Sequence, residues 1–127
     1  ISILQELRSQ NLIVGMVSAN RDHIVRQRLE QDGIFPLFNF IYCNAEEKSI
    51  ALREGLKKNG LAPNKTAYIG DIASDMSDAR TAGVIPIGIT RGYPSRQVLQ
   101  ENGAEHVITH LDELLPIVRN GNLRAQT

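Results

Sequence analysis

Two aspartates, four residues apart, follow an apolar segment of strand length. Asp71 and Asp75 come directly after residues 66–69, in a turn that leads into a predicted helix. Carboxylates this close repel each other unless a cation or a proton lies between them. Mg²⁺ prefers hard oxygen ligands and commonly takes one or two carboxylates together with water and substrate phosphate. The pair predicts a magnesium site, while a helix cap and an ordinary Gly-Asp turn are the structural alternative.

Two further residues have side chains suited to phosphate. Ser18 follows the apolar segment 12–17, so its hydroxyl and the backbone N–H groups of the next turn can hold a phosphate oxygen. Lys48 lies near the start of another predicted helix and carries a flexible point charge. A helix N-cap is the alternative role for Ser18, and a solvated surface position is the alternative for Lys48.

Strands and helices that alternate along the chain must position these residues. Apolar segments predict strands over 12–17, 40–43, 66–69, 84–89 and 106–108. Amphipathic spacing and stop signals predict helices over 2–11, 23–31, 46–59, 75–82, 95–102 and, after a capping box at 109–112, over the segment that includes 114–118. This order is typical of an α/β fold, a three-layer Rossmann-like parallel sheet with helices on both faces. Ligands then bind beyond the carboxyl ends of the strands.

Length and composition exclude several other classes of protein. The 127 residues suit one domain, with a polar tail over 120–127 that we expect to fray. Fourteen basic residues balance fourteen acidic ones, which argues against nucleic-acid or anionic-membrane binding. One Cys excludes a disulfide framework. Without a visible membrane segment or signal peptide, we expect a cytoplasmic protein.

The order of the signals is more specific than any one of them. A strand followed by Ser, then a Lys, then a strand followed by Gly-Asp-x-x-x-Asp and an Ala-Gly pair resembles the haloacid dehalogenase-like (HAD) superfamily, in its phosphoglycolate-phosphatase-like branch. The segments that carry the resemblance are 17–20, Lys48 and 70–83, together with 29–38, 92–95 and 111–115. They span nearly the whole chain.

The resemblance implies a Mg²⁺-dependent phosphatase that acts on a small phosphorylated metabolite, such as phosphoglycolate, through an aspartyl-phosphate. Ser18, Ala19 and Asn20 would bind the phosphate, and Lys48 would neutralise charge on the nucleophile and the phosphate. Asp71 would bind Mg²⁺, and Asp75 would bind it directly or through water. The resemblance also implies a monomer or a homodimer.

The sequence departs from the family pattern where the nucleophile is expected. The family carries Asp-x-Asp after its first strand, and no two aspartates of this sequence are separated by one residue. Residues 1–127 correspond to the core domain after the helical cap, so we expect a fold that is incomplete at its N-terminus. The family's first strand lies between the strands that end at Ser18 and Asp71. We therefore expect a gap there, with unpaired edges. Lys48 is also followed by Ser49 rather than the usual Pro.

Three alternatives remain open at the level of the sequence. A non-catalytic HAD-like domain would lack the nucleophile altogether. Another activity on the same scaffold, such as a phosphomutase or a dehalogenase, would use the same motifs. A receiver-like signalling domain fits the length, but Ser18, Asn44 and Thr90 stand where such a domain needs acidic residues and a Lys.

Overall fold

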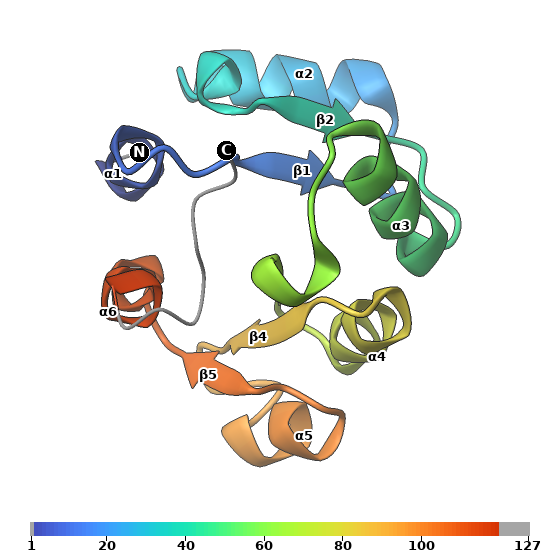
Figure 1. The fold of residues 1–127 in the computed structure, drawn as a ribbon, viewed down its shortest axis with the longest axis vertical. Coiled ribbons are helices and arrows are strands. Elements are labelled where there is room, and N and C mark those ends of the chain that lie inside the picture. The colour runs from blue at the N-terminus through green and yellow to red at the C-terminus, as the bar shows by residue number, and fades with distance from the viewer. Residues whose placement is uncertain (1, 120–127) are drawn as a thin grey trace.

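The computed structural model describes residues 2–119 as strands enclosed by helices. Helices α1 and α6 cover one side of the strands, and α3 and α4 cover the other (Figure 1). The helices are α1 (Ser2–Ser9), α2 (Asp22–Gln31), α3 (Lys48–Lys58), α4 (Ala73–Ala82), α5 (Arg96–Glu101) and α6 (Leu114–Arg119). The strands are β1 (Gly15–Val17), β2 (Phe40–Tyr42), β3 (Ala67–Gly70), β4 (Ile85–Ile89) and β5 (His106–Ile108). Short 3₁₀ helices occupy Phe35–Leu37 (η1), Pro63–Lys65 (η2) and Leu111–Glu113 (η3).

The strands form two parallel sheets rather than one. Strand β1 pairs with β2, and Gly15 lies opposite Phe40 in that register. Strands β3, β4 and β5 form the second sheet in that order, and Gly70 lies opposite Gly88. The α/β class and the parallel pairing confirm the sequence prediction.

Alternation along β3 and β4 builds a core on both faces of the larger sheet. Successive side chains of a strand point to opposite faces. On the α6 side, Ile87 is fully buried and packs with Leu114 and with Ile69 from β3. On the other side, Leu56 of α3 and the buried alanines of α4 pack against Tyr68. Burial on both faces explains why these strands are continuously apolar in sequence.

A cavity of about 520 Å³ lies between the two sheets. Both β1 and β3 line it, and within the described residues neither strand has a second partner on that side. The remaining lining is mostly apolar and comes from α1, α3, η3 and α6, with Leu7, Leu52, Leu56 and Leu114 among its residues. We call this cavity the inter-sheet slot. It confirms the gap that the motif order predicts.

Many element boundaries differ from the sequence prediction, most of them by one or two residues, and three differences are worth describing. The first strand begins at Gly15 instead of 12, because the side chain of Asn39 accepts the Val14 N–H at 2.8 Å before the ladder starts. Helix α4 begins at Ala73, two residues earlier than predicted, with Ile72 at its N-cap. The capping box is centred on His110 and Glu113 rather than on 109–112. The predicted tail at 120–127 lies outside the described residues.

Candidate active site

The loop after β1 is held by the loop after β2. The Ser18 N–H donates to the Tyr42 carbonyl at 2.8 Å, and the Ala45 N–H donates to the Ser18 carbonyl at 3.0 Å. The Ser18 hydroxyl accepts the Asn20 N–H at 3.1 Å, which folds Ser18, Ala19 and Asn20 into a tight turn. Ala19 and Asn20 are exposed and Ser18 is half-buried. A polar turn therefore stands at the carboxyl end of β1, where the sequence predicts phosphate binding.

An ion pair joins α3 to α4 beside the end of β3. The Lys48 Nζ lies 3.0 Å from Asp75 Oδ1, although the two residues are 27 positions apart in sequence. The Asp75 side chain is 4% exposed and that of Lys48 is 26% exposed. Lys48 is therefore not a solvated surface lysine. Its ammonium is held by a buried carboxylate, and part of its side chain remains open to solvent.

Gly70 makes room for the Asp75 carboxylate. A Cβ at position 70 would lie 2.3 Å from the Asp75 Cβ and 2.6 Å from its Oδ2, so no other residue fits without displacing α4. The Asp71 N–H then donates to Asp75 Oδ2 at 3.2 Å. Both carboxylate oxygens of Asp75 thus accept hydrogen bonds, one from the backbone and one from Lys48.

Asp71, in contrast, is exposed and directly follows the last residue of β3. Within residues 2–119, no group of three His, Cys, Asp or Glu side chains could hold a metal ion. Mg²⁺ does not need such a group, because it often keeps several waters and takes one or two carboxylates together with a phosphate. An exposed Asp71 with Asp75 four residues away fits a magnesium site of this kind.

Charge and burial shift the pKa values of the groups around the ion pair. Burial lowers the pKa of Lys48, but the hydrogen bond to Asp75 and the electrostatic attraction of Tyr68 and Asp75 outweigh it and raise the pKa above 10.5. Burial raises the pKa of Tyr68, and the negative charge of Asp75 raises it further. Partial burial and the charge of Asp75 also raise the pKa of Asp78. Lys48 therefore stays charged at any physiological pH.

Sequence reasoning missed Tyr68 as a neighbour of Lys48. A signal was present, because Tyr68 is the only polar-tipped side chain in an otherwise apolar strand. It stands two residues before Gly70, so the two residues share a face of β3. That face carries α4, on which Asp75 lies.

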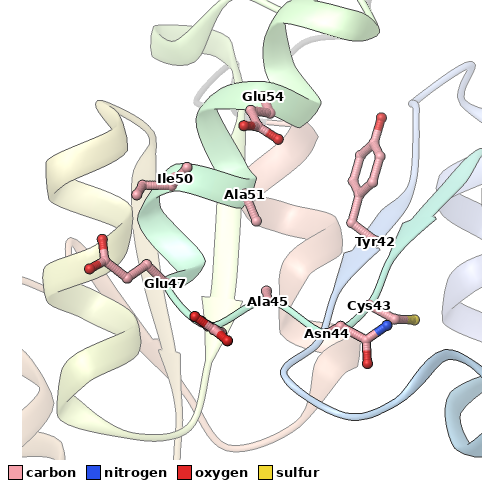
Figure 2. Close-up of a pocket in the computed structure, with 9 residues that line it drawn as sticks. Tyr42, Cys43, Asn44, Ala45, Glu47, Ile50, Ala51 and Glu54 are labelled. Atoms are coloured by element: carbon pink, nitrogen blue, oxygen red, sulfur yellow. The ribbon is translucent and has the colours of Figure 1, made fainter.

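A hollow of about 510 Å³ adjoins the start of α3. Figure 2 shows Tyr42, Cys43 and Asn44 on its β2 side, and Glu47, Ile50 and Glu54 on its α3 side. Glu46 lines it as well, so three carboxylates surround the space. The negative charge of such a hollow disfavours a phosphate there.

The predicted site residues fall into two groups. Lys48, Asp71 and Asp75 meet at the carboxyl end of β3 through the contacts above. Ser18 lies at the end of β1 and lines the inter-sheet slot, as do Tyr68 and Ile69 of β3. No hydrogen bond among the described residues joins the two groups directly. The slot separates the two halves of the candidate site.

No helix in residues 2–119 is long and apolar enough to cross a membrane.

Two curated phosphatases are similar to this chain in sequence. A phosphoglycolate phosphatase from Synechococcus elongatus is 30% identical over 99 residues, which cover 76% of this chain and 47% of that protein. A glyceraldehyde 3-phosphate phosphatase from Methanocaldococcus jannaschii is 28% identical and matches 94% of this chain and 55% of its own length. The chain thus spans about half the length of the curated relatives it matches.

A solved structure shares the fold. A haloacid dehalogenase-like family protein from Streptococcus pneumoniae superimposes with a TM-score of 0.81 at 24% identity, over 91% of this chain and 56% of that one. This likeness confirms the predicted HAD-like fold and decides against a receiver-like domain. The family model described as haloacid dehalogenase-like hydrolase matches residues 1–89, which is well over half of the chain. The chain therefore belongs to the haloacid dehalogenase-like hydrolase family.

Proposed function

We propose that this chain supplies the metal-binding and phosphate-binding parts of a Mg²⁺-dependent phosphatase that acts on a small phosphorylated metabolite. The observation that carries the proposal is the buried Lys48–Asp75 ion pair beside the exposed Asp71. A cation of fixed position and a free carboxylate at one strand end suit phosphoryl transfer, in which positioning and charge neutralisation dominate.

Each predicted residue has a role that its surroundings allow. The Lys48 ammonium neutralises charge on the phosphoryl group and on the attacking carboxylate. Asp75 holds that ammonium in place at 3.0 Å. On the other side of the slot, the turn formed by Ser18, Ala19 and Asn20 offers the Ser18 hydroxyl and the Ala19 N–H to a phosphoryl oxygen, because the N–H groups of Ser18 and Asn20 already donate within the protein.

Asp71 would hold Mg²⁺ directly, with Asp75 contributing through water because both of its oxygens already accept hydrogen bonds. When bound, the ion would offset the negative charge of the phosphoryl group and of the attacking carboxylate. The chain's own residues would do the remaining work. Lys48 supplies a fixed positive charge, and the Ser18 turn orients the phosphoryl oxygens.

The nucleophile of this proposal is an aspartate outside the 127 residues. The sequence contains no Asp-x-Asp. The inter-sheet slot is the place for an added strand, because β1 and β3 both present an edge to it and its walls are apolar on both faces. A strand seated there would end between Ser18 and Asp71. An aspartate at its carboxyl end would then lie between the two halves of the site, beside a phosphate bound there.

The chemistry then balances in two steps. A carboxylate oxygen of the first aspartate attacks phosphorus and forms the aspartyl-phosphate, while the ester oxygen leaves and takes a proton from the second aspartate of the Asp-x-Asp, which regains a proton from the attacking water in the next step. Water next attacks the phosphorus, which frees the aspartate and releases inorganic phosphate. The relatives named above are phosphatases for phosphoglycolate and glyceraldehyde 3-phosphate, so a small phosphorylated carboxylic acid or sugar is the substrate class that we propose.

The test uses a longer polypeptide in which a strand segment with Asp-x-Asp precedes Ile1. Asp71→Asn should abolish its Mg²⁺-dependent hydrolysis of p-nitrophenyl phosphate. Asp32→Asn is the matched control, because Asp32 is an exposed carboxylate at the end of α2. Full activity of the Asp71→Asn variant would overturn the metal assignment.

A further inference from the structure

A second hollow, of about 480 Å³, lies at the carboxyl ends of β4 and β5. The candidate phosphatase residues do not line it. Its walls carry two guanidinium groups and an imidazole, from Arg91, Arg96 and His110, together with the hydroxyls of Thr90 and Thr109. No acidic side chain is among the described residues that line it. We call it the basic pocket.

The two arginines differ in how they are held. One nitrogen of the Arg96 guanidinium donates to the Val107 carbonyl at 2.9 Å, which fixes this side chain across the end of β5. Arg96 keeps its other N–H donors. Arg91 is exposed and makes no ion pair or hydrogen bond with any residue that the structure describes. A guanidinium without a carboxylate partner is a donor fork suited to an oxyanion.

One carboxylate, that of Glu113, bonds to two lining residues of the pocket without lining it itself. Glu113 accepts the N–H groups of Thr109 and His110 at 2.7 and 2.9 Å, and the Thr109 hydroxyl at 3.1 Å. Its charge is thus bound by the backbone of the loop after β5. The amides of Thr109 and His110 are thus already in use, and Arg91 and Arg96 are the main charged donors left to a ligand of the pocket.

We propose that the basic pocket is a second anion site, which binds a phosphate group separately from the Ser18–Lys48 site. Parallel strands lie about 4.8 Å apart. The slot stands between β1 and β3, and the pocket lies beyond them over β4 and β5. A two- or three-carbon phosphoester therefore cannot reach both sites at once. The ligand is either free inorganic phosphate or the phosphate group of a separate metabolite.

The test titrates the ¹⁵N-labelled 127-residue protein with inorganic phosphate at constant ionic strength, and with glycerol 3-phosphate in a parallel arm. Amide shifts of Gly92, Thr109 and His110 report the basic pocket, and those of Ser18 and Asn20 report the proposed active site. Saturating shifts at the pocket with phosphate alone identify a site for the free ion. Tighter binding of glycerol 3-phosphate identifies a metabolite site.

Three variants separate the explanations. Arg91→Gln should weaken phosphate binding at the pocket by about fivefold or more, because it removes charge-assisted hydrogen bonds. It should fold normally, since Arg91 is exposed and without partners in the described part of the chain. Arg28→Gln removes the same charge from an exposed position on α2 and should leave pocket binding unchanged. Lys48→Gln should affect only the Ser18 region.

The outcomes distinguish this inference from the proposed function. Pocket shifts that Arg91→Gln reduces, and that persist in Lys48→Gln, support the second anion site. An absence of saturable shifts at Gly92, Thr109 and His110 overturns it, as does an equal loss in Arg28→Gln. If phosphate perturbs only Ser18 and Asn20, the proposed active site gains support and the pocket proposal fails. If the pocket saturates and the Ser18 region does not respond, the phosphate role of Ser18 fails alone.

Discussion

Gly70 is the residue on which the geometry of the candidate site depends most closely. Gly70 ends β3 and lets the Asp75 carboxylate lie against the strand. There the carboxylate accepts hydrogen bonds from the Asp71 N–H and from the Lys48 ammonium. The absence of a Cβ at Gly70 thereby determines where the Asp75 carboxylate lies, and with it the Lys48 ammonium of α3. Lys48, Asp71 and Asp75 all depend on this close approach.

A methyl group at position 70 tests that dependence. We expect Gly70→Ala to lower the free energy of unfolding by about 2 kcal/mol, because the Cβ would overlap Asp75 and push α4 away. Urea denaturation measures it. Gly33→Ala is the control, since Gly33 has a φ of 71° but nothing within 4 Å, which limits its cost to about 1 kcal/mol. A smaller loss for Gly70→Ala than for the control would contradict the packing argument.

The Lys48–Asp75 ion pair should make the free energy of unfolding depend on pH in the alkaline range. The pKa of Lys48 is raised in the folded protein, so its stabilising effect is complete below about 10.5 and is lost as the pH rises through the higher folded value. Asp75→Asn should remove this effect and cost about 1–3 kcal/mol near neutral pH.

Urea denaturation of the wild type and the variant between pH 8 and 11.5 checks this prediction. Subtraction cancels the lysines and tyrosines distant from Asp75. Tyr68 does not cancel, because Asp75 also raises its pKa, and it shrinks the difference in the same pH range as Lys48 does. We expect the difference in unfolding free energy to shrink above pH 10.5. A difference that stays constant across that range would show that the Lys48–Asp75 pair does not stabilise the fold.

Candidate site residues could be identified from the sequence, but the contacts between them could not. Ser18, Lys48, Asp71 and Asp75 stand out because each follows a strand or begins a helix. Nothing local indicates that Lys48 contacts Asp75, since the contact depends on how α3 packs against α4. Tyr68 was missed for the same reason. Its identity is visible in β3, but its neighbour comes from another element.

At the scale of elements, the sequence predicted which segments form strands more accurately than it predicted where each strand begins and ends. The first strand was expected from residue 12, but one of its edges faces the slot and the backbone of Val14 is instead bonded by Asn39. Helix α4 begins before Asp75, because Asp75 contributes its carboxylate to the site and Ile72 takes the cap position. Boundaries of this kind follow from tertiary contacts that periodicity does not record.

The cap of η3 gives an acid-side prediction. Backbone hydrogen bonds from Thr109 and His110 lower the pKa of Glu113 below 4.5. The stability that this carboxylate contributes is present above about 4.5 and is lost as the pH falls through the lower folded value.

Glu113→Gln should therefore destabilise the protein at pH 7, and this deficit should be smaller at pH 3. Thermal unfolding followed by circular dichroism at both pH values measures it. Asp112→Asn is the neighbouring control, because the Asp112 side chain makes no hydrogen bond with any residue that the structure describes. An equal effect of the two substitutions would argue against the cap.

For the whole molecule, the inter-sheet slot is the feature that the motif order predicted and local patterns could not. Two sheets present edges to one apolar cavity of about 520 Å³. Unpaired strand edges are ready templates for another strand. The slot therefore links the fold to the proposed chemistry, because the strand that completes the sheet would also bring the nucleophile.

A peptide that fills the slot should stabilise the protein. The peptide has an apolar segment of strand length followed by Asp-x-Asp at its carboxyl end. At a free peptide concentration of ten times its Kd, we expect it to raise the unfolding free energy by about 1.4 kcal/mol. Differential scanning calorimetry measures the shift. The same peptide with a central Pro cannot complete both ladders and should give no shift. An equal shift for both peptides would mean that binding does not use the strand edges.

Hydrolysis of p-nitrophenyl phosphate in Mg²⁺, by the 127-residue chain alone and with the Asp-x-Asp peptide, tests the central claim most directly. The chain alone should give no turnover above the Asp71→Asn variant. The chain with the peptide should give turnover that Asp71→Asn abolishes. Turnover by the chain alone that Asp71→Asn abolishes would place the nucleophile within these residues and contradict the account.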